Sequence, residues 1–173
     1  ELKKYVEAGI TTDHECFDID EAREKAGLGM HILIREGSAA KNFDTLIPLI
    51  NEIPDQIMFC SDDRHPDDLV KGHINELVNK ALKSGYDLFS VLRACTLHPV
   101  KYYGLNVGLL QEGDDADFIF SESLSEIIPS KVFIKGELLA DNGVSLIPAI
   151  GKTIPNNFFA EKLTIEDLLI RDC

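Results

Sequence analysis

Residues 1–105 alternate short apolar segments with helical patterns, and this alternation constrains the fold more than any other feature of the sequence. Strands are expected at residues 10–13, 30–34 and 57–60. Because consecutive parallel strands need a crossover connection, usually a helix, strands separated by helical segments predict a parallel sheet. The fold class that follows is α/β.

Local signals mark where the helices begin. Asp18 and Glu21 predict a capping box that opens a helix running to about Leu28. Asp87 is expected to cap a later helix, and Pro99 suits the first turn of a short one. Further helices are predicted at residues 1–8, 43–51 and 67–84.

The pattern changes near residues 105–108, after which short alternating segments are separated by Gly, Asn, Asp and Ser. Several strands are expected within 116–147, and Lys135-Gly136-Glu137 is predicted to be a hairpin turn. The sequence therefore predicts three parts. They are an α/β part at 1–105, a β part at 106–150 and the start of a further domain at 151–173.

The 173 residues carry a net charge of −13. Phosphate recognition needs a surplus of Lys and Arg, so we expect neither nucleic acid nor an anionic membrane surface as a partner. The four cysteines form no CxxC pair and no disulfide framework, and they are Cys16, Cys60, Cys95 and Cys173. With no signal peptide and no apolar run of about 18 residues, the expected location is the cytoplasm.

Polar and ionisable side chains gather where each of the first three predicted strands ends. The clusters are Thr11–Glu15, Ile34–Ser38 and Cys60–His65. Catalytic groups of parallel α/β barrels lie at the carboxyl ends of strands. Three consecutive units with this pattern therefore indicate an active site.

Two of these clusters contain candidate metal ligands. A neutral His14 after the first strand can bind a metal, with a flanking carboxylate fixing its tautomer, although a solvent-facing histidine is the alternative. Asp62 and Asp63 follow four apolar residues, where two carboxylates need a cation or donors nearby. The alternative is a solvated turn or helix cap. We assign Asp62 to the metal and the chemistry, and Asp63 to orienting a neighbour or capping the next turn.

Arg35 and Glu36 offer a donor beside an acceptor, which favours substrate recognition, although an ion pair is the alternative. His73 falls inside an amphipathic helical pattern. The alternative to a role at the site is therefore a packed or exposed position on that helix. Structural positions are expected for His31, His98, Phe158 and Phe159.

Six motifs stand in collinear order: AGITTDHE, LGMHILIREGSAAKN, CSDDRHPDDL, KGHIN, CTLHPVKYYGL and GDDADFIF. They resemble the adenine deaminases of the amidohydrolase superfamily over nearly the whole chain. The resemblance implies a (β/α)8 barrel, of which this chain supplies strands six, seven and eight, followed by part of a small β-sandwich. It also implies a homo-oligomer and hydrolysis of adenine to hypoxanthine and ammonia.

The resemblance implies a divalent metal, with Mn or Fe favoured over Zn, held in part by His14 and Asp62. A bound divalent metal lowers the pKa of water from 15.7 toward about 7, and Asp62 then carries the proton toward the leaving ammonia. The implied catalytic residues are Asp62, Asp63 and Glu15. The implied contacts to adenine come from Arg35, Glu36, Ser38, His65 and His73.

The superfamily's other metal ligands have no counterpart here and would lie upstream of Glu1. Because the chain lacks an initiator Met and begins within a helical pattern, we expect a piece of a longer polypeptide, inactive alone, that pairs with its upstream part. Two alternatives remain open. One is a cyclic amidohydrolase of the dihydroorotase or allantoinase type, and the other is a non-catalytic structural half-barrel.

Overall fold

The computed structural model describes residues 1–149, 151 and 156–169 of the chain. Its first sheet has three strands in the order β1-β2-β3, and both pairings are parallel. The strands are β1 (Thr12–Asp13), β2 (His31–Arg35) and β3 (Ile57–Cys60). The parallel sheet predicted from the alternation is therefore present, and the carboxyl ends of its strands share one edge.

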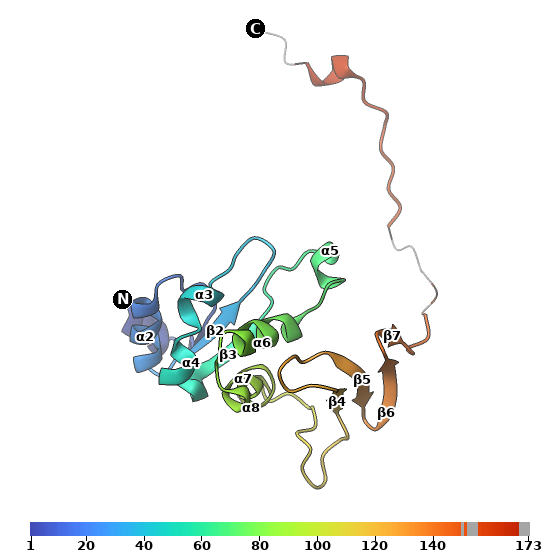
Figure 1. Ribbon diagram of the computed structural model, residues 1–173. Coiled ribbons are helices and arrows are strands. Elements are labelled where there is room, and N and C mark those ends of the chain that lie inside the picture. Colours follow the sequence, from blue (N-terminus) through green and yellow to red (C-terminus); the bar gives the residue numbers. More distant parts are fainter. Residues whose placement is uncertain (150, 152–155, 170–173) are drawn as a thin grey trace.

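Short helices accompany this sheet (Figure 1). Their bounds are α1 (Leu2–Glu7), α2 (Ile19–Gly27), α3 (Phe43–Leu46), α4 (Leu49–Glu52), α5 (Pro66–Leu69), α6 (Ile74–Lys83), α7 (Leu88–Cys95) and α8 (Leu97–Tyr103). A 3-10 turn, η1 (Pro54–Gln56), leads into β3. Helices α2 and α3 pack on β2, whereas α6, α7 and α8 pack on β3.

Two predicted helices are each divided in two. The helix predicted at 43–51 breaks between α3 and α4, where Pro48 has no N–H to donate. The helix predicted at 67–84 is interrupted, because α5 ends at Leu69 and α6 begins only after His73, which has φ −134° and ψ −128°. The N–H of His73 donates to Asn75 Oδ1 at 2.9 Å. His73 is therefore the residue before a helix start, not a residue inside a helix.

Helix α2 begins as predicted, although only half of the capping box forms. The Asp18 side chain accepts hydrogen bonds from the N–H groups of Asp20 and Glu21. The Glu21 carboxylate instead accepts from Lys25 Nζ at 2.6 Å, one turn along the helix. Lys25 lies beside the end of β1, because its Nζ also pairs with Asp13.

The hydrophobic core lies between the parallel sheet and its helices. Ile32 and Ile34 of β2 and Ile57 of β3 are fully buried. They pack in one cluster with Leu77 of α6 and Val91 of α7. Burial of each such side chain contributes roughly 1.5–3 kcal/mol, so the sheet edge is anchored by its apolar strands.

A second, antiparallel sheet has the order β4-β5-β6-β7. Its strands are β4 (Phe118–Ser121), β5 (Pro129–Ile134), β6 (Glu137–Asp141) and β7 (Val144–Ser145). The predicted hairpin turn is confirmed, because Lys135 (φ 52°) and Gly136 (φ 79°) connect the paired residues Ile134 and Glu137. The division into three domains at 105 and 150 stays a prediction.

Residues 156–169 form an extended segment that ends in a 3-10 turn, η2 (Ile165–Leu168), and lies apart from both sheets in Figure 1. Phe158 and Phe159 are 91% and 93% exposed, so the expectation that they belong to the core is wrong. Residues 170–173, the end of the further domain predicted at 151–173, lie outside the described residues. Within the part of the chain that the structure describes, no helix is long and apolar enough to cross a membrane.

Candidate active site

His14 and Asp62 meet at the carboxyl edge of the parallel sheet. His14 directly follows β1, and Asp62 lies two residues beyond the end of β3. The Nε2 atom of His14 lies 4.0 Å from Oδ1 of Asp62. The His14 side chain is 48% exposed and that of Asp62 is 19% exposed, so the pair is open to a ligand on one side.

Arg35, the last residue of β2, lies between these two strand ends. Its side chain is only 3% exposed, and its guanidinium donates to both oxygens of Glu15 at 2.8 Å. The same NH1 group donates to Oδ2 of Asp62 at 2.6 Å. The hydrogen bonds with Glu15, then the charges of Asp62 and Glu15, raise the pKa of Arg35 despite its burial. A buried, paired cation therefore connects carboxylates from the β1 and β3 ends.

The backbone at Asp62 has a left-handed conformation, with φ 51°. Side chains other than glycine rarely adopt this region, although Asp and Asn tolerate it better than most residues. Such a conformation costs about 1–2 kcal/mol. It also directs the Asp62 side chain toward β1 and β2, where Arg35 and His14 contact it.

Gly37 and Ser38 join the loop after β2 to the loop after β3. A Cβ at Gly37 would lie 3.1 Å from the carbonyl oxygen of Asp63 and 3.4 Å from that of Ser61, the two neighbours of Asp62. The N–H of Ser38 donates to the Asp63 carbonyl at 3.0 Å. Ser38 Oγ accepts from the N–H of His65 at 2.9 Å and donates to Asp68 Oδ2 at 2.6 Å.

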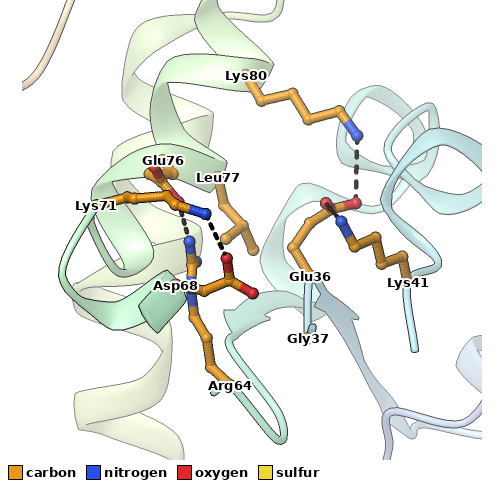
Figure 2. Close-up of a pocket in the computed structure, with 9 residues that line it drawn as sticks. All are labelled: Glu36, Gly37, Lys41, Arg64, Asp68, Lys71, Glu76, Leu77 and Lys80. Atoms are coloured by element: carbon orange, nitrogen blue, oxygen red, sulfur yellow. Dashed lines mark hydrogen bonds and ion pairs between the residues drawn. The ribbon is translucent and has the colours of Figure 1, made fainter. Parts of the chain in front are cut away.

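A pocket of about 250 Å³ lies next to these loops. Figure 2 shows that acidic and basic side chains make up most of its lining. Lys71 Nζ donates to Asp68 Oδ1 at 2.8 Å, and Arg64 pairs with Glu76 of α6. Lys80 of α6 donates to Glu36 at 3.2 Å. The Arg64–Glu76 and Lys80–Glu36 ion pairs connect both loops to α6, and the second holds the Glu36 carboxylate toward that helix.

The other predicted site residues lie around the same edge. Glu15 Oε1 lies 3.4 Å from His14 Nε2, so it belongs to the central cluster. His73 Nε2 lies 3.1 Å from Ser61 Oγ, beside the β3 end. Asp63 and His65 are exposed, and His65 is the residue before α5. His31 and His98 lie elsewhere. The His31 ring packs at a tilt of 54° against the Tyr102 ring, and His98 Nδ1 lies 2.9 Å from the carbonyl oxygen of Ile57.

The sequence interpretation missed Asn42. This residue is 2% exposed, and its Oδ1 accepts from the N–H of Arg35 at 2.8 Å. Its Nδ2 donates to the carbonyls of His14 at 3.2 Å and Cys16 at 3.0 Å. Asn42 therefore ties the His14 loop to the end of β2. A polar residue directly before the buried Phe43 was the available signal.

A separate group of possible metal ligands consists of Asp13, Cys16 and Glu21. Lys25 Nζ contacts all three, pairing with Asp13 and lying 3.4 Å from Cys16 Sγ and 2.6 Å from Glu21 Oε1. Burial and then the charge of Asp13 raise the pKa of Cys16 to about 11. An ammonium at the centre and a protonated thiol make this a lysine ion pair network, not a cation site.

Comparison with known proteins places the chain in a family. The family model described as "Amidohydrolase family" matches residues 2–139. The chain belongs to the amidohydrolase family. It is 53% identical over 98% of its length to an adenine deaminase of Salinibacter ruber (strain DSM 13855 / M31) and 50% identical over 97% to one of Methanosarcina mazei. The chain spans 31% and 30% of the length of these relatives.

Two solved structures of a β-aspartyl dipeptidase from Fervidobacterium islandicum AW-1 resemble the fold. Their TM-scores are 0.58 and 0.60, with sequence identities of 24% and 28%. The matches cover 76% and 75% of this chain and 38% and 36% of those chains. This amidohydrolase segment is therefore a mixed α/β structure of the same family fold.

Membership of this metal-dependent family supports a divalent metal ion as cofactor. The donor set at the sheet edge fits such an ion. An imidazole nitrogen and a carboxylate oxygen are ligands that Zn, Mn and Fe all accept, and they converge at 4.0 Å. In addition, Asp62 Oδ1 is the oxygen that Arg35 leaves free. His14 Nε2 and Asp62 Oδ1 would hold the metal.

Proposed function

We propose that the polypeptide containing this segment is an adenine deaminase, which hydrolyses adenine to hypoxanthine and ammonia. One observation carries the proposal. His14 Nε2 and Asp62 Oδ1 converge at the carboxyl edge of the sheet, in a chain 53% identical to a protein named adenine deaminase. Sequence identities of about one half to relatives named adenine deaminase also favour this assignment over a cyclic amidohydrolase and over a non-catalytic half-barrel.

Asp62 is the proposed proton carrier. Its Oδ1 faces His14, while its Oδ2 is bound to a permanent cation, so the two oxygens are not equivalent. The Asp62 carboxylate accepts a proton from the attacking water and then delivers it to the departing amino group. A divalent metal at His14 and Asp62 would supply the lowered pKa that makes water a nucleophile near neutral pH.

Contacts to the base are proposed for groups at the same edge. Glu15 lies beside His14, and His73 lies beside Ser61 at the β3 end. His65 and Asp63 are exposed on the loop that follows. Glu36 is held by Lys80, so it reaches a base only if that ion pair opens.

The intact protein is proposed to be a (β/α)8 barrel with a β-sandwich, of which this chain supplies three barrel strands and one sandwich sheet. We also propose Mn or Fe as the metal, a homo-oligomer, and a cytoplasmic role in purine salvage. The free thiols of Cys16, Cys60 and Cys95 support a reducing compartment. Because a catalytic metal needs three or more protein ligands, we expect the 173-residue segment alone to be inactive.

Ammonia release from adenine by the full-length, metal-loaded protein tests the proposal. Hydantoin, dihydroorotate and a β-aspartyl dipeptide serve as competing substrates, each followed by its ring-opening or cleavage product. Ammonia release from adenine with much lower turnover of the other three is the expected result. Turnover of one of the other substrates without deamination of adenine would refute the assignment.

A further inference from the structure

Arg35 at the end of β2 and Ser38 in the loop after it hold the loop that carries Asp62, and they do so at different atoms. Arg35 holds the side chain, because NH1 donates to Oδ2 of Asp62 at 2.6 Å. Ser38 holds the backbone that follows, through the carbonyl of Asp63 at 3.0 Å and the N–H of His65 at 2.9 Å. The side chain and the main chain of this loop are therefore fixed independently.

The conformation of Asp62 shows why such support is needed. A non-glycine residue keeps a left-handed backbone only where its surroundings over-determine that conformation, and such residues cluster at functional sites. Asp62 has φ 51°. The close approach of Gly37 to the carbonyls of Ser61 and Asp63 adds a third restraint, directly on either side of Asp62.

Arg35 has little capacity left to contact a substrate. Three of its hydrogen bonds already go to Glu15 and Asp62, and its side chain is 3% exposed. Its Nε is buried and makes no hydrogen bond within the described part of the chain, so no ligand reaches it without displacing protein atoms. This arrangement differs from the direct base contact expected from the sequence.

We propose that Arg35 and Ser38 are positioning residues, which hold Asp62 in its left-handed conformation with Oδ1 turned toward His14. Arg35 fixes Oδ2, so the remaining oxygen faces the reaction centre. Ser38 fixes the backbone that would otherwise relax. The inference rests on the proposed function, in which Asp62 carries the proton.

The expected kinetic signature is a fall in kcat with little change in KM. A misplacement of about 1 Å at a reacting group lowers the rate by about 100-fold. R35M also releases Glu15, but His73 and His65 of the proposed base contacts have partners other than Arg35, so most of the ground-state binding is retained. R35M in the full-length protein is therefore expected to lose about 100-fold in kcat.

R35K and R35A extend the test by changing the geometry of the donor. Lysine offers a point charge and not a planar fork, so R35K is expected to fall between wild type and R35M. Added millimolar guanidinium is expected to restore part of the kcat of R35A, whereas methylammonium is not. R23M is the matched control, because Arg23 also binds carboxylates of two elements, Glu52 and Asp20, but far from the strand ends.

S38A tests the backbone contact on its own. Removing Oγ frees the N–H of His65 and leaves the Arg35 bond intact, so kcat is expected to fall by less than in R35M. S84A is the control, because Ser84 Oγ donates only to its own helix, at the carbonyl of Lys80. S84A is expected to match wild type.

Crystal structures of R35M and R23M give a readout that does not depend on activity. The proposal expects the Asp62 carboxylate in R35M to turn Oδ1 away from His14, and in R23M to keep Oδ1 facing His14. An unchanged orientation of the Asp62 carboxylate in R35M would overturn the proposal, as would a raised KM with unchanged kcat, which would indicate a direct base contact. Should the wild-type protein release no ammonia from adenine, the proposed function fails, and the two structures still decide the positioning role.

Discussion

The guanidinium of Arg35 and the carboxylate of Asp62 form a 2.6 Å hydrogen bond between neighbouring strand ends, leaving one oxygen of Asp62 free. That free oxygen lies 4.0 Å from His14 Nε2. The three side chains come from three consecutive parallel strands, so the register of the sheet sets their spacing. Arg35 and Cys60 are paired in this register, which places Asp62 just beyond Arg35 at the edge.

Asp62→Asn in the full-length protein should abolish deamination while the protein stays folded. The amide keeps the size of the side chain but cannot accept the proton from water. We expect kcat to fall by about 10²- to 10⁴-fold in an ammonia-release assay, with an unchanged circular dichroism spectrum. Asp63→Asn is the comparison, because the Asp63 side chain is exposed and only its carbonyl is held. Equal losses in both variants would remove Asp62 from its assigned role.

His14→Gln should weaken metal binding. Loss of an outer partner of a metal ligand typically lowers affinity by 10–100-fold, so loss of the ligand itself should cost at least about 10-fold. Metal content by mass spectrometry after dialysis against a weak chelator measures the effect. His65→Gln is the control for metal content, because His65 is an exposed histidine before α5. Full metal occupancy in the His14 variant would contradict the assignment.

Gly37→Ala should destabilise the protein by about 1–3 kcal/mol, because the added methyl group meets backbone carbonyls that cannot move freely. The nearest are those of Ala40 and Asp63, both at 3.1 Å. Gly27→Ala is the matched control, since a Cβ at Gly27 meets nothing within 4 Å. That change should be neutral or stabilise by up to about 1 kcal/mol. Urea unfolding of both variants measures the difference, and equal stabilities would show that the two loops are not tightly apposed.

The charge of Asp68 should make the thermal stability of the protein depend on pH under acidic conditions. Hydrogen bonds from Lys71 and then Ser38 lower the pKa of Asp68 from 3.8 to about 2. A lowered folded-state pKa stabilises the protein above the unfolded value, and this contribution is lost as the pH falls from 3.8 toward 2. The Tm difference between wild type and Asp68→Asn should therefore be constant near neutral pH and shrink in that window. Asp67→Asn, at the exposed neighbouring residue, is the control for the loss of one negative charge.

The strands were predictable from the sequence, because four or five apolar residues bounded by turn signals leave few alternatives. β3 was predicted at its observed bounds, and β2 within one residue. The helix breaks were not predicted, since apolar spacing continues across Pro48 and across His73. Backbone hydrogen bonding, not the hydrophobic pattern, ends those helices.

The residues at the site were predictable as a group, whereas their contacts were not. Position after a strand placed His14, Arg35 and Asp62 at one edge, as the parallel sheet requires. The pairing of Arg35 with Glu15 and Asp62 depends on side-chain reach across strands, which spacing along the chain does not encode. The role of Asn42 was missed for the same reason, because its partners lie on a different loop.

The left-handed backbone at Asp62 means that two separate requirements, one from folding and one from proton transfer, restrict the residue type at this position. Folding alone admits the residues that tolerate φ near 51°, chiefly Gly, Asn and Asp. Proton transfer alone admits a carboxylate, which means Asp or Glu. Only aspartate meets both demands. In a saturation library at this position, survival of the fold and survival of activity should therefore rank the substitutions differently, with Asn and Gly high in the first and absent from the second.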